Sequence, residues 1–143
     1  MNRLSKIIIL SICLTIFFGS ACNREDRIPY VPVNIQLYLN TAEFQDLKIA
    51  GTWKYITGGS KGIIVFCPYA GEYYAFERNC PYQPFNDSAR VYVDETNIFA
   101  VCQHCGSKFN LYDGSVVLDP ATMPLLQYTT YLENDILYIY NTY

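Results

Sequence analysis

The chain has 143 residues, enough for one ordinary domain, and its 10 Lys and Arg against 13 Asp and Glu give a net charge of −3. Arg3 and Lys6 are the only charged residues before position 22, so removing residues 1–21 leaves 8 basic and 13 acidic side chains, a net charge of −5. No basic cluster remains, which argues against nucleic acid and against an anionic lipid surface as partners. Fourteen tyrosines favour strands over helices.

The first segment has the layout of a secretory signal peptide. Arg3 and Lys6 give it a positive end, a largely apolar run follows from 7 to 18, and small residues come next. This run is too short to cross a bilayer as a mature helix. We therefore predict that residues 1–21 are a signal peptide that is cleaved off.

Small residues directly precede a cysteine in Gly19-Ser20-Ala21-Cys22. This order resembles the bacterial lipobox, although Gly19 stands where that motif usually has leucine. The resemblance implies that Cys22 becomes the lipid-modified first residue, which would anchor the protein to a membrane. Residues 22–28 are mostly polar or charged and are expected to form the tether. We accordingly expect a membrane-anchored lipoprotein of a bacterial cell envelope, facing the periplasm or the outside.

Residues 29–143 are predicted to form one all-β domain, because apolar and polar residues alternate with a period of two almost throughout. The expected strands are 31–39, 63–67, 72–77, 91–93, 98–102, 108–111, 116–118, 125–132 and 136–140. The spacing in Asn40-Thr41-Ala42-Glu43 is that of a capping box and predicts one short helical turn over 41–47. Residues 58–62 lack the spacing of a phosphate-binding loop and are predicted to be a plain loop.

Four cysteines remain for the folded domain: Cys67, Cys80, Cys102 and Cys105. Outside the cytoplasm, thiols tend to form disulfides unless a metal or a cluster occupies them. Cys102 and Cys105 form a C-x-x-C pair, which places two sulfurs on one side of a tight turn and suits both zinc and iron–sulfur clusters. Cys80 is the third candidate ligand.

Two further residues are expected not to be ligands. Cys67 lies beside the turn of the predicted 63–77 hairpin, whereas Cys80 follows the far end of the returning strand, so the two should be well separated. His104 is the only histidine. It occupies a middle position of the C-x-x-C turn, where side chains point outward, and it is expected on the loop surface.

The order of the segments 71–82, 102–115 and 120–128 resembles a Rieske iron–sulfur domain. The shared features are Asn-Cys-Pro-Tyr after a strand, then Cys-Gln-His-Cys-Gly-Ser-Lys-Phe, a downstream Asp-Gly, and Pro-Ala-Thr-Met-Pro-Leu. The resemblance covers about residues 30–141. It implies a Rieske-like all-β fold of three stacked antiparallel sheets, in which two loops hold a [2Fe–2S] cluster and a proline-containing loop covers it.

The resemblance also assigns the ligand positions, and the set is incomplete. Cys80 and Cys102 match the two cysteines of the inner iron, while Tyr82 and Cys105 stand where the two histidines should be. A Rieske site needs two histidines on its outer iron, and this chain has one, His104, in the wrong register. The standard ligand set is therefore lost.

Three functions are compatible with these residues. The first is a non-enzymatic structural or binding module without a cluster, in which Cys80 pairs with Cys102 or Cys105 in a disulfide. The second is an electron-transfer or metal-binding protein that holds a [2Fe–2S] cluster or a single metal ion through Cys80, Cys102 and Cys105, with the Tyr82 oxygen as a further ligand. The third is a thiol–disulfide redox protein using Cys102 and Cys105, which is disfavoured because a strand, not a helix, adjoins the motif. The sequence does not identify a protein or small-molecule partner.

Overall fold

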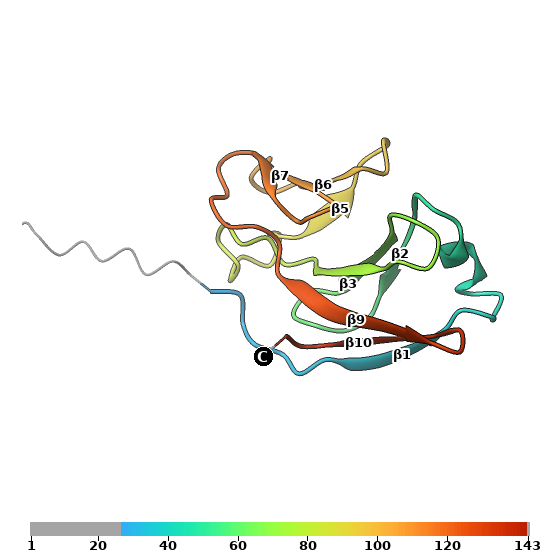
Figure 1. Ribbon diagram of the computed structural model, residues 1–143. Helices are drawn as coiled ribbons and strands as arrows, with labels where there is room; N and C mark the ends of the chain where they lie inside the picture. Colours follow the sequence, from blue (N-terminus) through green and yellow to red (C-terminus); the bar gives the residue numbers. More distant parts are fainter. Residues whose placement is uncertain (1–26, 143) are drawn as a thin grey trace, which may run out of the picture.

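The computed structural model describes residues 27–142, which contain ten strands and one short 3-10 turn in two antiparallel sheets (Figure 1). The predicted signal peptide, Cys22 and most of the predicted tether lie outside the described residues. Within residues 27–142, no helix has the length and the apolar character that a membrane span requires. The predicted all-β class is confirmed.

The larger sheet has six strands in the order β1-β10-β9-β4-β3-β2. Their bounds are β1 Asn34–Tyr38, β2 Thr52–Ile56, β3 Ile63–Cys67, β4 Tyr74–Glu77, β9 Gln127–Glu133 and β10 Ile136–Tyr140. Its two three-stranded parts are joined where β4 pairs with β9, and this pairing involves only two residue pairs, Ala75 with Tyr128 and Phe76 with Gln127. Strand pairing therefore gives two sheets where the resemblance implied three, because this short ladder links two of them.

The smaller sheet has four strands in the order β5-β6-β7-β8. Their bounds are β5 Val91–Val93, β6 Phe99–Cys102, β7 Lys108–Asn110 and β8 Val116–Leu118. All four lie between β4 and β9 in the chain, although β4 and β9 pair with each other. The smaller sheet is thus an excursion from the larger one, and Figure 1 shows β5, β6 and β7 set apart from β9, β10 and β1.

One strand was missed, and the one predicted helical turn is present with different bounds. Strand β2 was not predicted, although its residues Thr52 to Tyr55 alternate between polar and aromatic side chains. The helical turn η1 spans Gln45–Lys48 and begins four residues later than expected, with no side-chain cap. The Thr41 hydroxyl does not cap it; it donates instead to the Tyr38 carbonyl, at 2.7 Å, in the turn that follows β1.

Strand β3 separates the two hydrophobic cores of the molecule, and all five of its residues are buried. Ile63, Val65 and Cys67 face a core shared with β1, β9 and β10, while Ile64 and Phe66 face a second core shared with the smaller sheet. A strand buried on both faces has the continuous apolar run seen here. The second core also contains Cys80 and Cys102, which places the candidate ligands against the strand that organises the fold.

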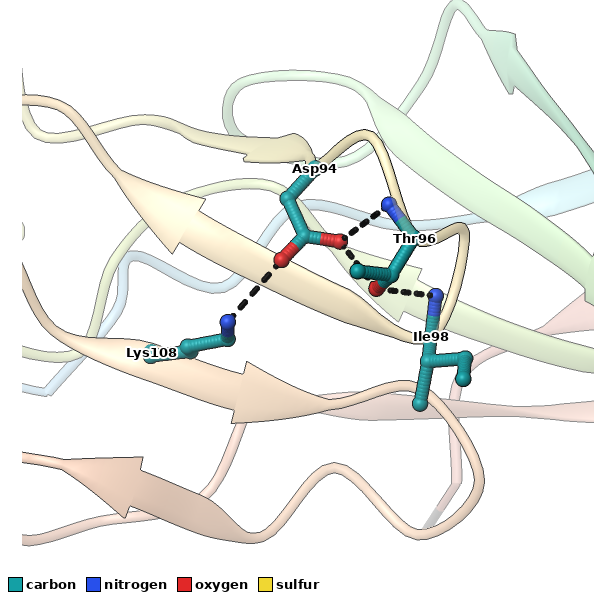
Figure 2. Close-up of polar contacts among 4 residues, drawn as sticks. All are labelled: Asp94, Thr96, Ile98 and Lys108. Carbon is teal, nitrogen blue, oxygen red and sulfur yellow. Dashed lines mark hydrogen bonds and ion pairs between the residues drawn. The ribbon is translucent and has the colours of Figure 1, made fainter.

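The turn between β5 and β6 is held by a polar network that Figure 2 shows. One Asp94 carboxylate oxygen accepts hydrogen bonds from the backbone and hydroxyl of Thr96, and the other pairs with the Lys108 ammonium at 3.0 Å. The Thr96 hydroxyl in turn accepts from the Ile98 backbone N–H at 3.2 Å. Because Lys108 belongs to β7, the network ties three strands of the smaller sheet together, including β6, which ends at Cys102.

Candidate thiolate metal site

The sulfur atoms of Cys80, Cys102 and Cys105 all lie within 4.8 Å of one another. They come from two loops: the first spans residues 78–90 between β4 and β5, and the second spans 103–107 between β6 and β7. A third loop, 119–126 between β8 and β9, adjoins the second. The structure therefore brings together the three cysteines selected from the sequence.

The first loop leaves the larger sheet at a firmly held strand end. The Glu77 carboxylate is fully buried and accepts four hydrogen bonds. The donors are the backbone N–H groups of Ser60 (2.6 Å), Lys61 (2.9 Å) and Asn79 (2.9 Å) and the hydroxyl of Tyr128 (2.7 Å). A buried carboxylate with this many partners fixes its surroundings, because each bond to a charged group is strong and costly to lose. Cys80 follows three residues later and is held in position by this anchor.

The second loop is a tight turn that begins at the end of β6. The Gly106 N–H donates to the Cys102 carbonyl at 2.8 Å, and the Cys102 N–H donates to the Ser107 carbonyl, also at 2.8 Å. Gly106 has φ = 82°, a left-handed conformation that glycine adopts without strain. This turn directs the Cys105 sulfur back toward Cys80, at a distance of 3.8 Å.

Ser107 connects the second loop to the third. Its side chain is fully buried, and its oxygen accepts a hydrogen bond from the Ala121 backbone N–H at 2.9 Å. The same hydroxyl lies 3.1 Å from the Cys105 sulfur, and its own proton is therefore available to that sulfur. Ser107 thus stabilises the thiolate form of Cys105 and keeps the third loop beside the site.

The three thiols are not equivalent. Burial raises the pKa of Cys80 above its usual value, a hydrogen bond from the Tyr82 backbone opposes this, and the neighbouring Cys102 charge adds to it. For Cys105 the effect of burial is outweighed by hydrogen bonds, first from the Ser107 side chain and backbone and then from Cys102 and Cys80, so its pKa is lowered. Cys80 and Cys102 are fully buried, whereas Cys105 is half-buried. Cys105 therefore ionises more readily than Cys80, and a solute reaches it more easily than the two buried cysteines.

Cys67, His104 and Tyr82 differ in their surroundings from the three clustered cysteines. Cys67 is buried in the other core and its thiol donates to the Tyr69 carbonyl at 3.1 Å. His104 is exposed, as expected, and its Nε2 lies 3.2 Å from both the Gln83 and Asn86 side chains of the first loop. Tyr82 is 36% exposed, and its backbone forms a hydrogen bond to the Cys80 thiol.

Lys61 is a component of the site that the sequence analysis missed. Its ammonium donates to three carbonyls of the first loop, those of Pro84 (3.1 Å), Asn86 (2.5 Å) and Ala89 (3.0 Å). Burial lowers the pKa of Lys61, and the charges of Asp87, Cys102 and Cys80 act in the opposite direction. The Lys61 ammonium is therefore a fixed positive charge bound to the backbone of the loop that carries Cys80. The sequence contained no signal for this role, because Lys61 lies in a glycine-rich loop 19 residues before Cys80.

The spacing of the sulfurs fits a single metal ion. Tetrahedral zinc with Zn–S bonds of about 2.3 Å places its thiolate sulfurs about 3.8 Å apart. The Cys80–Cys105 distance is 3.8 Å, and the other sulfur distances do not exceed 4.8 Å. Ligands on two different irons of a cluster must lie farther apart, because the second iron and the bridging sulfides separate them. Three thiolates around one ion also leave a fourth position open.

The donor set does not fit a Rieske cluster. Two imidazoles would have to face the outer iron. The only histidine contacts the outer surface of the first loop, and the second histidine position holds Cys105, which lies close to both of the other cysteines. No step of a mechanism through that cluster can be derived from these residues.

The fold and the site together define an all-β domain with a three-thiol centre at converging loops. No protein family model and no curated protein matches the chain. Among solved structures, the ferredoxin of carbazole 1,9a-dioxygenase from Nocardioides aromaticivorans IC177 aligns at 14% identity with a TM-score of 0.50, covering 79% of this chain and 100% of that one. A chain of a variant oxygenase–ferredoxin complex of carbazole 1,9a-dioxygenase aligns at 16% identity with a TM-score of 0.50, covering 75% of this chain and 28% of that one. This likeness confirms the predicted Rieske-like fold, and at this identity it concerns the fold alone.

Proposed function

We propose that this protein is a non-enzymatic, membrane-anchored metal-binding lipoprotein that holds one thiophilic metal ion, with Zn²⁺ as the tetrahedral case, through Cys80, Cys102 and Cys105. The observation that carries the proposal is the approach of the three sulfurs to within 4.8 Å, with Cys80 and Cys105 at 3.8 Å. Soft thiolate ligands select such metals. The lipid anchor on Cys22 and the location in the cell envelope rest on the signal-like residues 1–22.

The charges around the site favour this occupant. Three thiolates carry −3 and a divalent ion +2, which leaves −1, and the Lys61 ammonium next to the first loop supplies +1. A buried charge is tolerated only when it is compensated nearby. The Cys80 thiol, whose pKa is raised, would lose its proton on metal binding, so the affinity is expected to increase with pH.

Electron transfer is the second candidate, because the structural likeness is to a ferredoxin. It requires iron at the same three cysteines with a ligation different from the Rieske pattern. A disulfide between Cys80 and Cys105 is the competing state of the site in an oxidising envelope. These alternatives are mutually exclusive at any one time, since each uses the same sulfurs.

The test is metal binding by the reduced full-length protein. Titration with Co²⁺, which reports ligand type and geometry by its colour, should give sulfur-to-metal charge-transfer bands that saturate at one ion per chain and disappear when Zn²⁺ is added. Cys105→Ser should weaken Zn²⁺ binding at least a hundredfold, since it removes one of three protein ligands. Cys67→Ala is the matched control and should leave the affinity unchanged.

Three outcomes would contradict the proposal. Cobalt bands that persist in Cys105→Ser would place the metal elsewhere. Reconstitution with iron and sulfide to two irons per chain, with no binding of Zn²⁺, would favour the electron-transfer candidate. If the fully reduced protein bound no metal saturably, the alternative of a structural or binding module with a disulfide would be favoured instead.

A further inference from the structure

A polar pocket that contains none of the cysteines lies where β2 of the larger sheet meets the first loop. It has a volume of about 460 Å³, within the usual range for small-ligand pockets. Its walls come from the end of β2, the loop 57–62, and both ends of the first loop. The lining includes Tyr55, Ile56, Lys61, Arg78 and Arg90 and contains no Asp or Glu.

The charge of this pocket is unusual for an acidic protein. Three cationic side chains line it, and none forms an ion pair within residues 27–142, where the recorded pairs are Lys48 with Asp135, Lys54 with Asp46 and Lys108 with Asp94. The Glu77 carboxylate lies beneath the adjacent loop and is occupied by its four donors. Acidic groups act on two of these cations, Asp87 on Lys61 and Glu77 on Arg78, but none lines the pocket, so an anion bound there would still be attracted by the three cationic side chains.

The two guanidinium groups have free donors. Arg78 is only 8% exposed; its guanidinium lies 3.7 Å from the centre of the Tyr55 ring and 4.8 Å from that of Tyr92, and its Nε donates to the Val91 carbonyl. That is the only hydrogen bond recorded for its side chain in the described part of the molecule, which leaves its terminal nitrogens for a ligand. Contact with these two aromatic rings and the hydrogen bond from Nε restrain the guanidinium before a ligand arrives.

Arg90 has still fewer partners. Its Nε is buried and has no hydrogen-bond acceptor within residues 27–142. A buried donor without an acceptor costs free energy, and such a group in a native structure calls for an explanation. Arg90 lies close enough to Arg78 for their charges to interact, so one anion in the pocket would be attracted by both guanidinium groups.

From these contacts we infer that the pocket between Arg78 and Arg90 binds the oxyanion group, phosphate or carboxylate, of a small soluble ligand. Guanidinium forks bind both groups through paired, charge-assisted hydrogen bonds. The volume exceeds that of the anion alone, and the side chains of Tyr55 and Ile56 border the remaining space. Lys61 contributes charge but no donor, because its ammonium is already occupied by three carbonyls. This inference does not depend on metal binding.

The experiment is calorimetric titration of the reduced, metal-free full-length protein with inorganic phosphate and, separately, with succinate. At least one of them should bind saturably, with an affinity that falls as NaCl is added. Arg90→Gln should weaken binding about tenfold or more, as expected for loss of charged hydrogen bonds. This variant should keep its unfolding temperature, because Arg90 gives up no recorded side-chain hydrogen bond. Arg78→Lys, which keeps the charge but removes the fork, should weaken binding severalfold.

Lys54→Gln is the matched control, since it removes one positive charge from β2, which borders the pocket, at a residue that does not line it, and should change the affinity less than twofold. Equal weakening in Arg90→Gln and Lys54→Gln would show a general charge effect and overturn the inference, as would the failure of both anions to bind saturably. Cys105→Ser should bind the anion as the parent does, and Arg90→Gln should keep the cobalt–thiolate bands. Failure of the anion site and failure of the metal site are thereby distinguishable.

Discussion

Cys67 and Cys80 are both fully buried, yet they have opposite surroundings. Cys67 ends β3, lies among the side chains of the larger sheet's core and has a backbone carbonyl as its polar neighbour. Cys80 follows β4, and two further thiols lie within 4.8 Å of it. Burial raises the pKa of both thiols. The difference shows that burial alone does not make a candidate metal ligand; the convergence of two loops is what brings the three sulfurs together.

The largest expected effect is the stabilisation of the fold by Zn²⁺, which should depend on Cys80 and not on Cys67. Zn²⁺ at a thousandfold excess over its dissociation constant should raise the free energy of unfolding by about 4 kcal/mol, because it binds only the folded site. Cys80→Ala should abolish this gain, and Cys67→Ala should retain it. Denaturant unfolding with and without Zn²⁺ measures the gain within each variant, so any cost of the substitution itself cancels. An equal loss of the gain in both variants would refute the distinction.

A slightly smaller effect is expected on oxidation. The sulfurs of Cys80 and Cys105 are 3.8 Å apart and their residues are separated by 25 positions, so mild oxidation of the metal-free protein should join them. Closing a loop of this size should stabilise the fold by about 3 kcal/mol. Peptide mapping by mass spectrometry should find the Cys80–Cys105 link and a free Cys67. A disulfide that contains Cys67 would contradict the separation of the two environments.

A substitution in the smaller sheet should destabilise the surroundings of the three clustered cysteines more than those of Cys67. Asp94→Asn weakens the contacts to Lys108 and Thr96 that hold the β5–β6 turn (Figure 2), and should lower the free energy of unfolding by about 1 kcal/mol. In the variant, thiol labelling should accelerate more at Cys105 than at Cys67. Faster labelling of Cys67 alone would show that this network supports the larger sheet instead.

The contribution of Asp94 should also depend on pH. Burial acts to raise its pKa, but bonds from Thr96 and Lys108 outweigh this and hold the pKa below its usual value of 3.8. The stabilisation by Asp94 is therefore present above that value and is lost as the pH falls through the lowered pKa. The parent and Asp94→Asn proteins should differ in stability at neutral pH and approach each other in acid, as chemical unfolding at several pH values would show.

The smallest effect concerns the rate of thiol modification. The pKa of Cys105 is lowered and those of Cys67 and Cys80 are raised, so alkylation by iodoacetamide should begin at lower pH for Cys105 than for the other two. At neutral pH it should be severalfold faster at Cys105. Ser107→Ala removes a hydrogen-bond donor to this sulfur and should shift its profile toward higher pH. An unchanged profile in that variant would exclude Ser107 as the cause.

The sequence predicted those features that depend on neighbours along the chain. Alternating apolar residues located nine of the strands, and Gly106-Ser107 with its flanking cysteines identified the second loop. Strand β2 is a short edge strand and was missed although Thr52 to Tyr55 alternate between polar and aromatic residues. The spacing of Asn40–Glu43 predicted the helical turn but placed its start four residues too early, because η1 follows Phe44 without a side-chain cap.

Features that depend on distant segments were not predictable in this way. The roles of Lys61 and Glu77 arise only when the loop 57–62 packs against the first loop and β4. Similarly, Arg78 and Arg90 line one pocket because the two ends of the first loop lie side by side. The bridge between Asn79 and Arg90 holds these ends together. No spacing along the chain indicates any of these contacts.

The Lys61 ammonium also affects how well the first loop is ordered before any metal ion binds. Carbonyls of Pro84, Asn86 and Ala89 surround it much as the oxygens of an ionophore surround a potassium ion. The first loop is therefore already wrapped around a cation that the chain itself supplies. A metal ion that bound at Cys80 would meet a loop with its shape in place, and its binding would require the loss of protons more than the ordering of the backbone. Metal exchange at such a site should proceed without unfolding and refolding of the loop.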